Sequence, residues 1–399
     1  MEPQVQHLNE MLSKVDGFIY PNEIELNWSV LIVLYPYITG LVAGAFILAS
    51  LERVFKVKVL RPTYTIALLT ALGFLLVATM PLISHLAQPQ RFYEIMITPH
   101  FTSAMAIFGF IYLWYLMVVL LLEIWLDYRR DLVLWSQEKT GVMKHVYKIL
   151  TLGVTDLSPK ALKWDDKLGY AITVIGIPSA FLLHGYVGFI FGSVKANPWW
   201  STVLMPVIFI FSAMVSGIAL VMVVFMVVNY IRKKMIDMAC LDTIAKYLLI
   251  ALILDFALEG LDQVHRIYEA EESFQILDLL VKGKLTYTLF LFQWGLGMLV
   301  PILVLAYFQM FKSKERLRRI LYLITGVLVL VGIFFMRWNV VVGGQLFSKS
   351  FYGFTAFKLQ LIGPEGSLMA VVWLIVPLLI VAFLFWLLPP WKRHAEPET

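Results

Sequence analysis

The sequence predicts an all-α protein, a polytopic bundle of about nine transmembrane helices. Hydrophobic residues make up 60% of its 399 residues, charged residues make up 15%, and the mean hydropathy is +0.80. Soluble domains are only about 45–50% apolar, so this composition excludes a soluble protein. Two patterns then define the spans: apolar runs long enough to cross a bilayer, and basic clusters that follow alternate runs.

A membrane helix needs about 20 mostly apolar residues. Nine runs meet this requirement, and eight or ten are the neighbouring alternatives. The runs are 28–51, 64–87, 101–125, 168–193, 202–231, 243–264, 285–311, 317–341 and 368–388. We therefore treat residues 1–399 as one integral membrane domain.

Basic residues follow the first, third, fifth, seventh and ninth runs. They include Arg53, Lys56, Lys58, Arg129, Arg130, Lys144, Arg232, Lys233, Lys234, Lys314, Arg318, Arg319, Lys392 and Arg393. The positive-inside rule then places the N-terminus outside and the C-terminus in the cytoplasm, and nine helices fit without a violation. The net charge of +5 therefore reflects the basic residues that set the topology, and it does not indicate nucleic-acid binding. We expect a multi-pass protein of the cell membrane, in contact with the lipid bilayer.

Two connecting segments are long enough to have structure of their own. The cytoplasmic segment 127–167 mixes charged and aromatic residues, which favours either an interaction surface or a basic tether along anionic lipid. The outer-face segment 265–284 contains a short amphipathic stretch, 273–280, that cannot span a bilayer. The first 26 residues lack a basic region followed by an apolar core, so no cleaved signal peptide is expected.

A single cysteine, Cys240, limits the chemistry that this chain can hold. Iron-sulfur clusters and structural zinc sites need several thiolates or histidines, so we expect neither a cluster nor another metal site here. Any metal redox centre would belong to a partner subunit.

His184 is the most unusual residue of the fourth run, because an ionisable group inside a membrane is costly and is by default a functional candidate. The alternative is a purely structural role, in which a neutral histidine forms a hydrogen bond with a neighbouring carbonyl. His184 lies 18 residues beyond Asp166, which is at the cytoplasmic end of the helix. This spacing corresponds to about 27 Å along a helix, nearly the thickness of the hydrocarbon core, so His184 should lie close to the outer face. Gly185, Gly188 and Gly192 leave room for close helix packing or a flat ligand, and the tryptophans at 199 and 200 suggest the water interface.

The sixth run carries an acidic stripe. Asp255, Glu259, Asp262 and Arg266 are spaced by four, three and four residues, which places them on one helix face. Such a stripe must face the bundle interior, pair with cations or contact water. We expect either a proton relay that ends near His184 or an ion-pair network with Arg266 and Arg337.

These features, in this order, resemble the NrfD/PsrC family of integral membrane quinone-reactive subunits, in particular its larger members of the HybB, HmcC and DsrP type. A Leu-His followed by glycines, a tryptophan corner, and a Pro-x-x-F-x-x-S-A-x-x-x-G run occur at Leu183-His184, Pro198-Trp199-Trp200 and Pro206 to Gly217. The first helix, with Trp28, Tyr35, Gly40 and Gly44, resembles the family's first helix. One departure is Phe211-Ser212-Ala213, where several relatives have an acid.

The resemblance implies quinone chemistry at the outer face. It makes His184, Glu259 and Asp262 the candidate catalytic residues. The candidate quinone-binding residues are His184, Trp28, Tyr35, Tyr186, Asp255, His85 and His100. Menaquinone is the expected substrate, bound without haem or an iron-sulfur cluster in this chain.

The resemblance also implies partners and a role in sulfur or sulfate respiration. The expected partners are an outer-face ferredoxin-like iron-sulfur subunit, a multihaem cytochrome c, and a second membrane subunit with a cytoplasmic heterodisulfide-reductase-like subunit. The expected reaction is quinol oxidation with proton release.

Two other functions remain open at this point. A cytochrome b subunit would ligate haem between His85 and His184, but no helix carries two histidines about a dozen residues apart. A secondary transporter would use the acids to bind a coupling ion and would break its helices at Pro178 and Pro206.

Overall fold

The computed structural model describes residues 12–13, 15–24, 26, 28–269, 273–363 and 365–392, and most of them are helical. Residues 1–11 lie outside the described residues, and so does Arg393. The long bundle contains α2 (Val30–Arg53), α3 (Arg61–Ala78), α4 (Met80–His85), α5 (Glu94–Ile97), α6 (Ala104–Trp114), the π-helix η4 (Tyr115–Leu121), α7 (Leu122–Glu138), α8 (Gly141–Leu150), α9 (Pro159–Gly192), α10 (Met205–Ile231), α11 (Met238–Glu269), α12 (Phe274–Lys282), the π-helix η5 (Thr286–Leu299), α13 (Val300–Met310), α14 (Glu315–Val341) and α15 (Ser367–Leu387).

Short 3-10 turns and one small sheet complete the described chain. The turns are η1 (Pro21–Glu23), η2 (Lys58–Leu60), η3 (Pro89–Arg91) and η6 (Gly343–Gln345). Strands β1 (Asp16–Phe18) and β2 (Tyr352–Phe354) pair antiparallel, with Gly17 opposite Gly353. This sheet ties the segment before the first membrane helix to the segment before the last.

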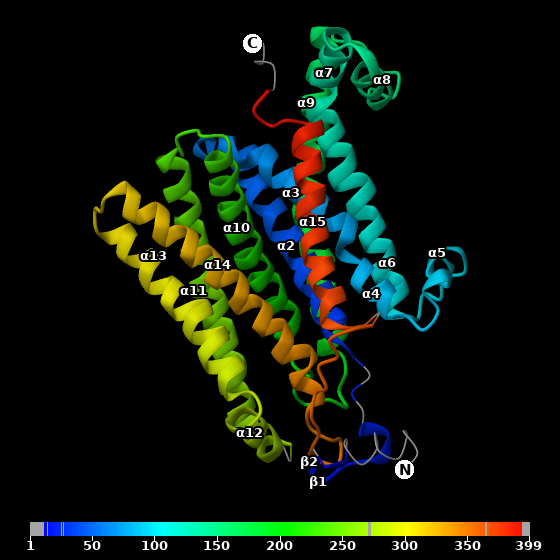
Figure 1. The fold of residues 1–399 in the computed structure, drawn as a ribbon, viewed down its shortest axis with the longest axis vertical. Coiled ribbons are helices and arrows are strands. Elements are labelled where there is room, and N and C mark those ends of the chain that lie inside the picture. The colour runs from blue at the N-terminus through cyan, green and yellow to red at the C-terminus, as the bar shows by residue number, and fades with distance from the viewer. Residues whose placement is uncertain are drawn as a thin grey trace.

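Eight helical segments among the described residues are long and apolar enough to cross a membrane. Charged residues exclude α11 from this set, yet α11 runs along the bundle beside α10 (Figure 1). The β1–β2 sheet and the last turn of α15 lie at opposite ends of the bundle (Figure 1), which requires an odd number of crossings. These eight segments, with α11 packed beside α10, confirm the predicted polytopic all-α bundle.

Helix α2 is the centre of the bundle. Every residue from Val30 to Ser50 is buried, and α3, α9, α10, α14 and α15 all contact it. Gly44 of α2 and Gly217 of α10 explain the closest of these contacts. A Cβ at Gly44 would lie 2.0 Å from the carbonyl oxygen of Ala213, and one at Gly217 would lie 2.3 Å from the Ala45 nitrogen. The backbones of α2 and α10 therefore touch, as small residues allow in membrane bundles.

Gly217→Ala is expected to prevent normal assembly of the bundle, because its new methyl group would overlap the backbone of α2. The cost should exceed the roughly 1–3 kcal/mol of ordinary core overpacking, since neither backbone can turn away. The matched control is Gly260→Ala on α11, where a Cβ meets no heavy atom within 4 Å. Thermal unfolding and gel filtration of both variants test this, and equal stability would contradict the packing argument.

The predicted loop 127–167 is largely helical, which differs from the hydropathy boundaries. Helix α7 continues to Glu138, α8 follows, and α9 begins at Pro159 instead of residue 168. The hydroxyl of Ser158 caps α9 by accepting from the Ala161 nitrogen at 3.3 Å. Charged residues continue these helices beyond the apolar part, so α7, α8 and the start of α9 project from one end of the bundle (Figure 1).

The opposite end carries the corner between α9 and α10, the β1–β2 sheet and α12 (Figure 1). The short amphipathic stretch predicted at 273–280 forms α12. Residues 270–272 of the surrounding loop lie outside the described residues.

Candidate functional site

The corner between α9 and α10 is locked onto the end of α14. Asn197 donates from its side-chain amide to the carbonyl of Gly344 at 2.6 Å. The indole nitrogens of Trp199 and Trp200 donate to the carbonyls of Asn339 and Val340 at 2.8 and 2.6 Å. Both tryptophans are buried against the protein, and they satisfy the otherwise free carbonyls at a helix C-terminus.

His184 lies in the bundle interior and is fully buried. Its Nε2 accepts a hydrogen bond from Nη2 of Arg337 at 2.9 Å. Its Nδ1 is 3.4 Å from the hydroxyl oxygen of Thr39, and that hydroxyl donates to the Tyr35 carbonyl at 2.8 Å. Because Thr39 uses its hydrogen elsewhere and arginine can only donate, the network assigns the neutral tautomer with its hydrogen on Nδ1.

Space for the imidazole depends on two neighbours. A Cβ at Gly40 would lie 3.1 Å from Cε1 of His184, so a larger residue at that position would press on the ring. Phe209 stacks on the other side, with ring centroids 5.5 Å apart. The glycine of the first helix therefore makes room for the histidine of the fourth.

Arg337 on α14 links most of the polar interior. It is fully buried and donates from Nη2 to the Ser212 hydroxyl at 2.6 Å as well as to His184. Its Cζ lies 4.0 Å from the centroid of the Phe209 ring. The guanidinium also interacts electrostatically with Asp255 and Glu259 on α11. A buried cation is tolerated only where acceptors and opposite charge surround it, and these residues provide both.

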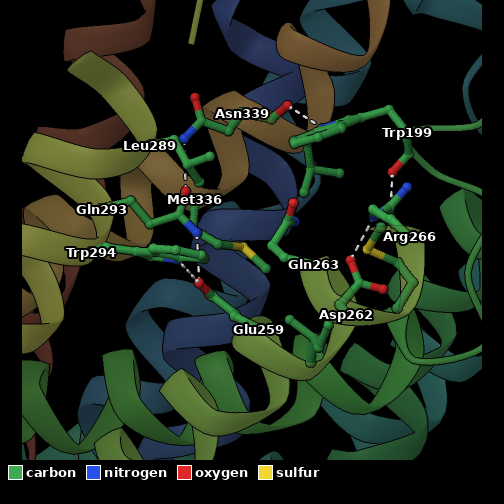
Figure 2. Close-up of a pocket in the computed structure, with 13 residues that line it drawn as sticks. Trp199, Glu259, Asp262, Gln263, Arg266, Leu289, Gln293, Trp294, Met336 and Asn339 are labelled. Atoms are coloured by element: carbon green, nitrogen blue, oxygen red, sulfur yellow. Dashed lines mark hydrogen bonds and ion pairs between the residues drawn. The ribbon is translucent and has the colours of Figure 1, made fainter. Parts of the chain in front are cut away.

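Glu259 faces a cavity between α11, η5, α14 and the corner, drawn in Figure 2. Its Oε2 accepts from the Gln293 amide and from the Trp294 indole, both at 2.7 Å. Its Oε1 has no hydrogen-bond partner among the described residues. Asn339 donates to Gln293 at 2.7 Å, which fixes the orientation of that amide.

The walls of this cavity combine aromatic and apolar side chains with a few polar groups. Trp199, Trp294, Leu289, Met336 and Ile208 provide the apolar part. Such a lining, with few and convergent polar groups, is typical of sites for small, mainly apolar ligands.

Asp262 has a different environment from Glu259. Its two oxygens accept from the Thr202 hydroxyl at 2.7 Å and from Arg266 Nε at 2.9 Å. Arg266 also donates to the carbonyls of Pro198 and Trp199 at 2.5 and 2.9 Å. The predicted alternative of an ion pair with Arg266 therefore holds for Asp262, where it fastens the corner, whereas the donors to Glu259 are neutral.

Asp255 is fully buried, and neither carboxylate oxygen has a hydrogen-bond partner in the described part of the chain. It lies one helical turn from Glu259 on the same face of α11. The acidic stripe thus faces the bundle interior, which is one of the three alternatives that the sequence left open.

The remaining predicted binding residues do not line this cavity. Trp28 stacks on Trp200 at 5.5 Å, and Tyr35 packs edge-on against Phe108 at 6.0 Å. Tyr35 also lies within electrostatic reach of Arg337, whereas the half-buried Tyr186 contacts Phe189. The other two lie near the molecular surface: Nδ1 of His85 is 3.2 Å from Glu365, and His100 is exposed.

The described residues do not fit a haem held between His85 and His184. Nε2 of His184 is bonded to a cation and Nδ1 faces Thr39, so neither nitrogen is directed at a space for iron. No group of three or more His, Cys, Asp or Glu residues that could hold a metal ion occurs within the described ranges.

Several site residues were missed by the sequence analysis, namely Thr39, Gln293, Trp294 and Asn339. Gln293 and Asn339 interrupt long apolar runs and could have been identified by the criterion applied to Glu259, which is that a polar group within a span needs a partner. The sequence offers no such signal for Thr39 or Trp294, because both are common in membrane helices.

The fold and the site define a multi-pass integral membrane protein with a buried cation, an acidic helix face and an apolar cavity at one end. Residues 21–349 match the family model described as polysulphide reductase, NrfD. The chain therefore belongs to the NrfD family.

Curated relatives agree with this assignment. A selenate reductase subunit of Mesobacillus selenatarsenatis is 28% identical over 330 residues, which cover 79% of this chain and 73% of that protein. A putative dimethyl sulfoxide reductase membrane subunit of Halobacterium salinarum is 28% identical over 70% of this chain and 61% of its own length. Protein NrfD of Escherichia coli is 28% identical over 50% and 59%, respectively.

Proposed function

We propose that this chain is the quinone-reactive membrane subunit of a reductase complex, in which it oxidises a quinol and passes the electrons to an iron-sulfur partner. Family membership and relatives named as subunits of selenate and dimethyl sulfoxide reductases support this proposal. A respiratory complex of this kind needs a membrane site where an apolar ring with two oxygens can bind and exchange protons.

The observation that carries the proposal is the free carboxylate oxygen of Glu259 at an apolar cavity. Gln293 and Trp294 hold the other oxygen, so the carboxylate is oriented before any substrate arrives. A positioned acid or base of this kind contributes about 10²–10⁴-fold to proton transfer. Oxidation of a quinol releases two electrons and two protons, and Glu259 would take a proton from one hydroxyl group.

A proton accepted by Glu259 has a short way to the end of the bundle. Asp262, Thr202 and Arg266 border the cavity or adjoin it, and a second hollow beyond them is lined by His265 and Glu269. This end is the outer face in the proposed orientation, with the N-terminus outside and the C-terminus in the cytoplasm.

The finer proposals concern substrate and partners. We propose menaquinone as the quinone, an outer-face ferredoxin-like iron-sulfur subunit as the electron acceptor, and a DsrP-like role in sulfur or sulfate respiration. The proposed complex also contains a multihaem cytochrome c and a second membrane subunit with a heterodisulfide-reductase-like subunit. Proteins that co-purify with the tagged chain test each partner, and the quinone extracted from the purified complex tests the substrate.

Glu259→Gln is expected to slow quinol-analogue oxidation by the intact complex on the order of a hundredfold. The carbonyl oxygen of glutamine can still accept from Gln293 and Trp294, so assembly should be unchanged. Asp262→Asn is the contrasting variant: it breaks the pair with Arg266 and should lower stability more than turnover. Near-normal turnover by Glu259→Gln, or loss of its folded complex, would show that Glu259 is structural.

A further inference from the structure

Glu123, a buried acid outside the acidic stripe of α11, lies far from the cavity, near the end of the bundle from which α8 projects. It is the second residue of α7, directly after the π-helix η4, and its side chain is fully buried. Nothing in the proposed quinone chemistry uses it. An ionisable group inside a membrane bundle is costly, and π-helical segments are frequent at functional sites.

The environment of Glu123 repeats the pattern seen at Glu259. One carboxylate oxygen, Oε1, accepts from the hydroxyls of Thr173 at 2.7 Å and Tyr64 at 3.2 Å. The other, Oε2, has no hydrogen-bond partner among the described residues. At Glu259, too, the paired oxygen has two donors, both from a π-helix, η5.

Thr173 allows Glu123 to exist in two protonation states. Its hydroxyl oxygen lies 2.7 Å from Glu123 Oε1 and 2.9 Å from the Gly169 carbonyl oxygen, but it has one hydrogen. With Glu123 ionised, Thr173 donates to the carboxylate. With a proton on Oε1, the carboxyl donates to Thr173, which then donates to Gly169. A rotation of one hydroxyl therefore satisfies both states.

A line of polar groups leads from Glu123 to solvent. Arg53 donates to the Tyr64 hydroxyl at 2.7 Å and to Asp127 at 3.2 Å, and it reaches the exposed Asp166 at 3.4 Å. Gly169 leaves space for this guanidinium, because a Cβ there would lie 2.4 Å from Arg53 Nη2. The polar and ionisable groups around Glu123 are Arg53 of α2, Tyr64 of α3, Tyr115 of η4, Asp127 of α7 and Thr173 of α9.

We propose that Glu123 is a proton-exchange site that opens, through the Tyr64 hydroxyl, to the solvent at the α8 end of the bundle, where the permanently charged Arg53 orients that hydroxyl without passing a proton itself. Its ligand is the proton: the carboxylate takes one from water at that end and returns it there or passes it inward. The inference does not depend on quinone chemistry at Glu259, which lies towards the opposite end.

Infrared spectroscopy of the full-length chain in lipid nanodiscs tests this proposal without any redox turnover. Acidification should produce a protonated-carboxyl C=O band that is absent from Glu123→Gln, and transfer to D₂O should shift this band within minutes. A spectrum without such a band at any pH, or a band that resists exchange for hours, would overturn the proposal.

Tyr64→Phe tests the route. It should slow the D₂O shift of the Glu123 band at least tenfold, because it removes the hydroxyl between Arg53 and the carboxyl. The matched control is Tyr112→Phe, since the Tyr112 hydroxyl donates to the Leu75 carbonyl and has no hydrogen bond to Glu123 among the described residues. Equal exchange rates in both variants would overturn the proposed route. Should Glu123→Gln fail to fold, the displaced band of Glu123→Asp identifies the group.

Discussion

Arg337→Met is expected to abolish quinol oxidation and to destabilise the bundle. Methionine has a similar reach but no charge. The variant would leave His184 and Ser212 without their shared donor and would leave Asp255 and Glu259 without the nearby cation. Each buried polar group that is left without its hydrogen-bond partner typically costs about 1–3 kcal/mol. Thermal unfolding of the purified chain and turnover of the complex measure the two effects.

A double-mutant cycle separates electrostatics from packing in this prediction. If the lost stability reflects an uncompensated carboxylate, adding Asp255→Asn to Arg337→Met should restore much of it, because the acid no longer needs the cation. Additive losses in the double variant would refute this explanation. Arg337→Lys keeps the charge but cannot donate in two directions from a planar group, so it should fold and turn over slowly.

The parts of the fold that depend on local sequence composition were predictable. Long apolar runs identified the membrane helices, including the run 243–264 in α11, which is not among the eight clearly apolar spans because of its charged residues. The boundaries of α7 and α9 were not predictable, because charged residues continue both helices beyond the apolar stretch. The π-helices η4 and η5 were not predicted, because neither segment has a sequence pattern that distinguishes it from an α-helix.

The candidate site was predictable only in part. The spacing of Asp255, Glu259 and Asp262 correctly placed all three on the buried face of α11. The pair of Asp262 with Arg266 follows from their spacing of four residues on one helix. By contrast, the tertiary fold brings Gln293 and Trp294 to Glu259, so those two donors could not be inferred. A resemblance in the fourth helix drew attention to His184, but its contact with Arg337 joins residues 153 positions apart.

His184→Ala is expected to leave an assembled protein whose quinol oxidation falls on the order of a hundredfold. The structure suggests how this loss arises. Nε2 of His184 accepts from Arg337, so the imidazole could take a proton at that nitrogen only after the guanidinium moved away. We therefore propose that His184 is a positioning residue, which holds Arg337 between Ser212 and the acids of α11.

His184→Gln distinguishes this role from that of a proton-accepting base. The glutamine carbonyl can accept from Arg337 but cannot carry a proton at physiological pH. A positioning role predicts that glutamine restores kcat to within about tenfold of the wild type, whereas alanine and leucine do not. A glutamine variant as slow as the alanine variant, with the same assembly and quinone affinity, would instead assign the proton to His184. In that case the pH profile of kcat should also lose a limb that the wild type shows, because the group that titrates would be missing.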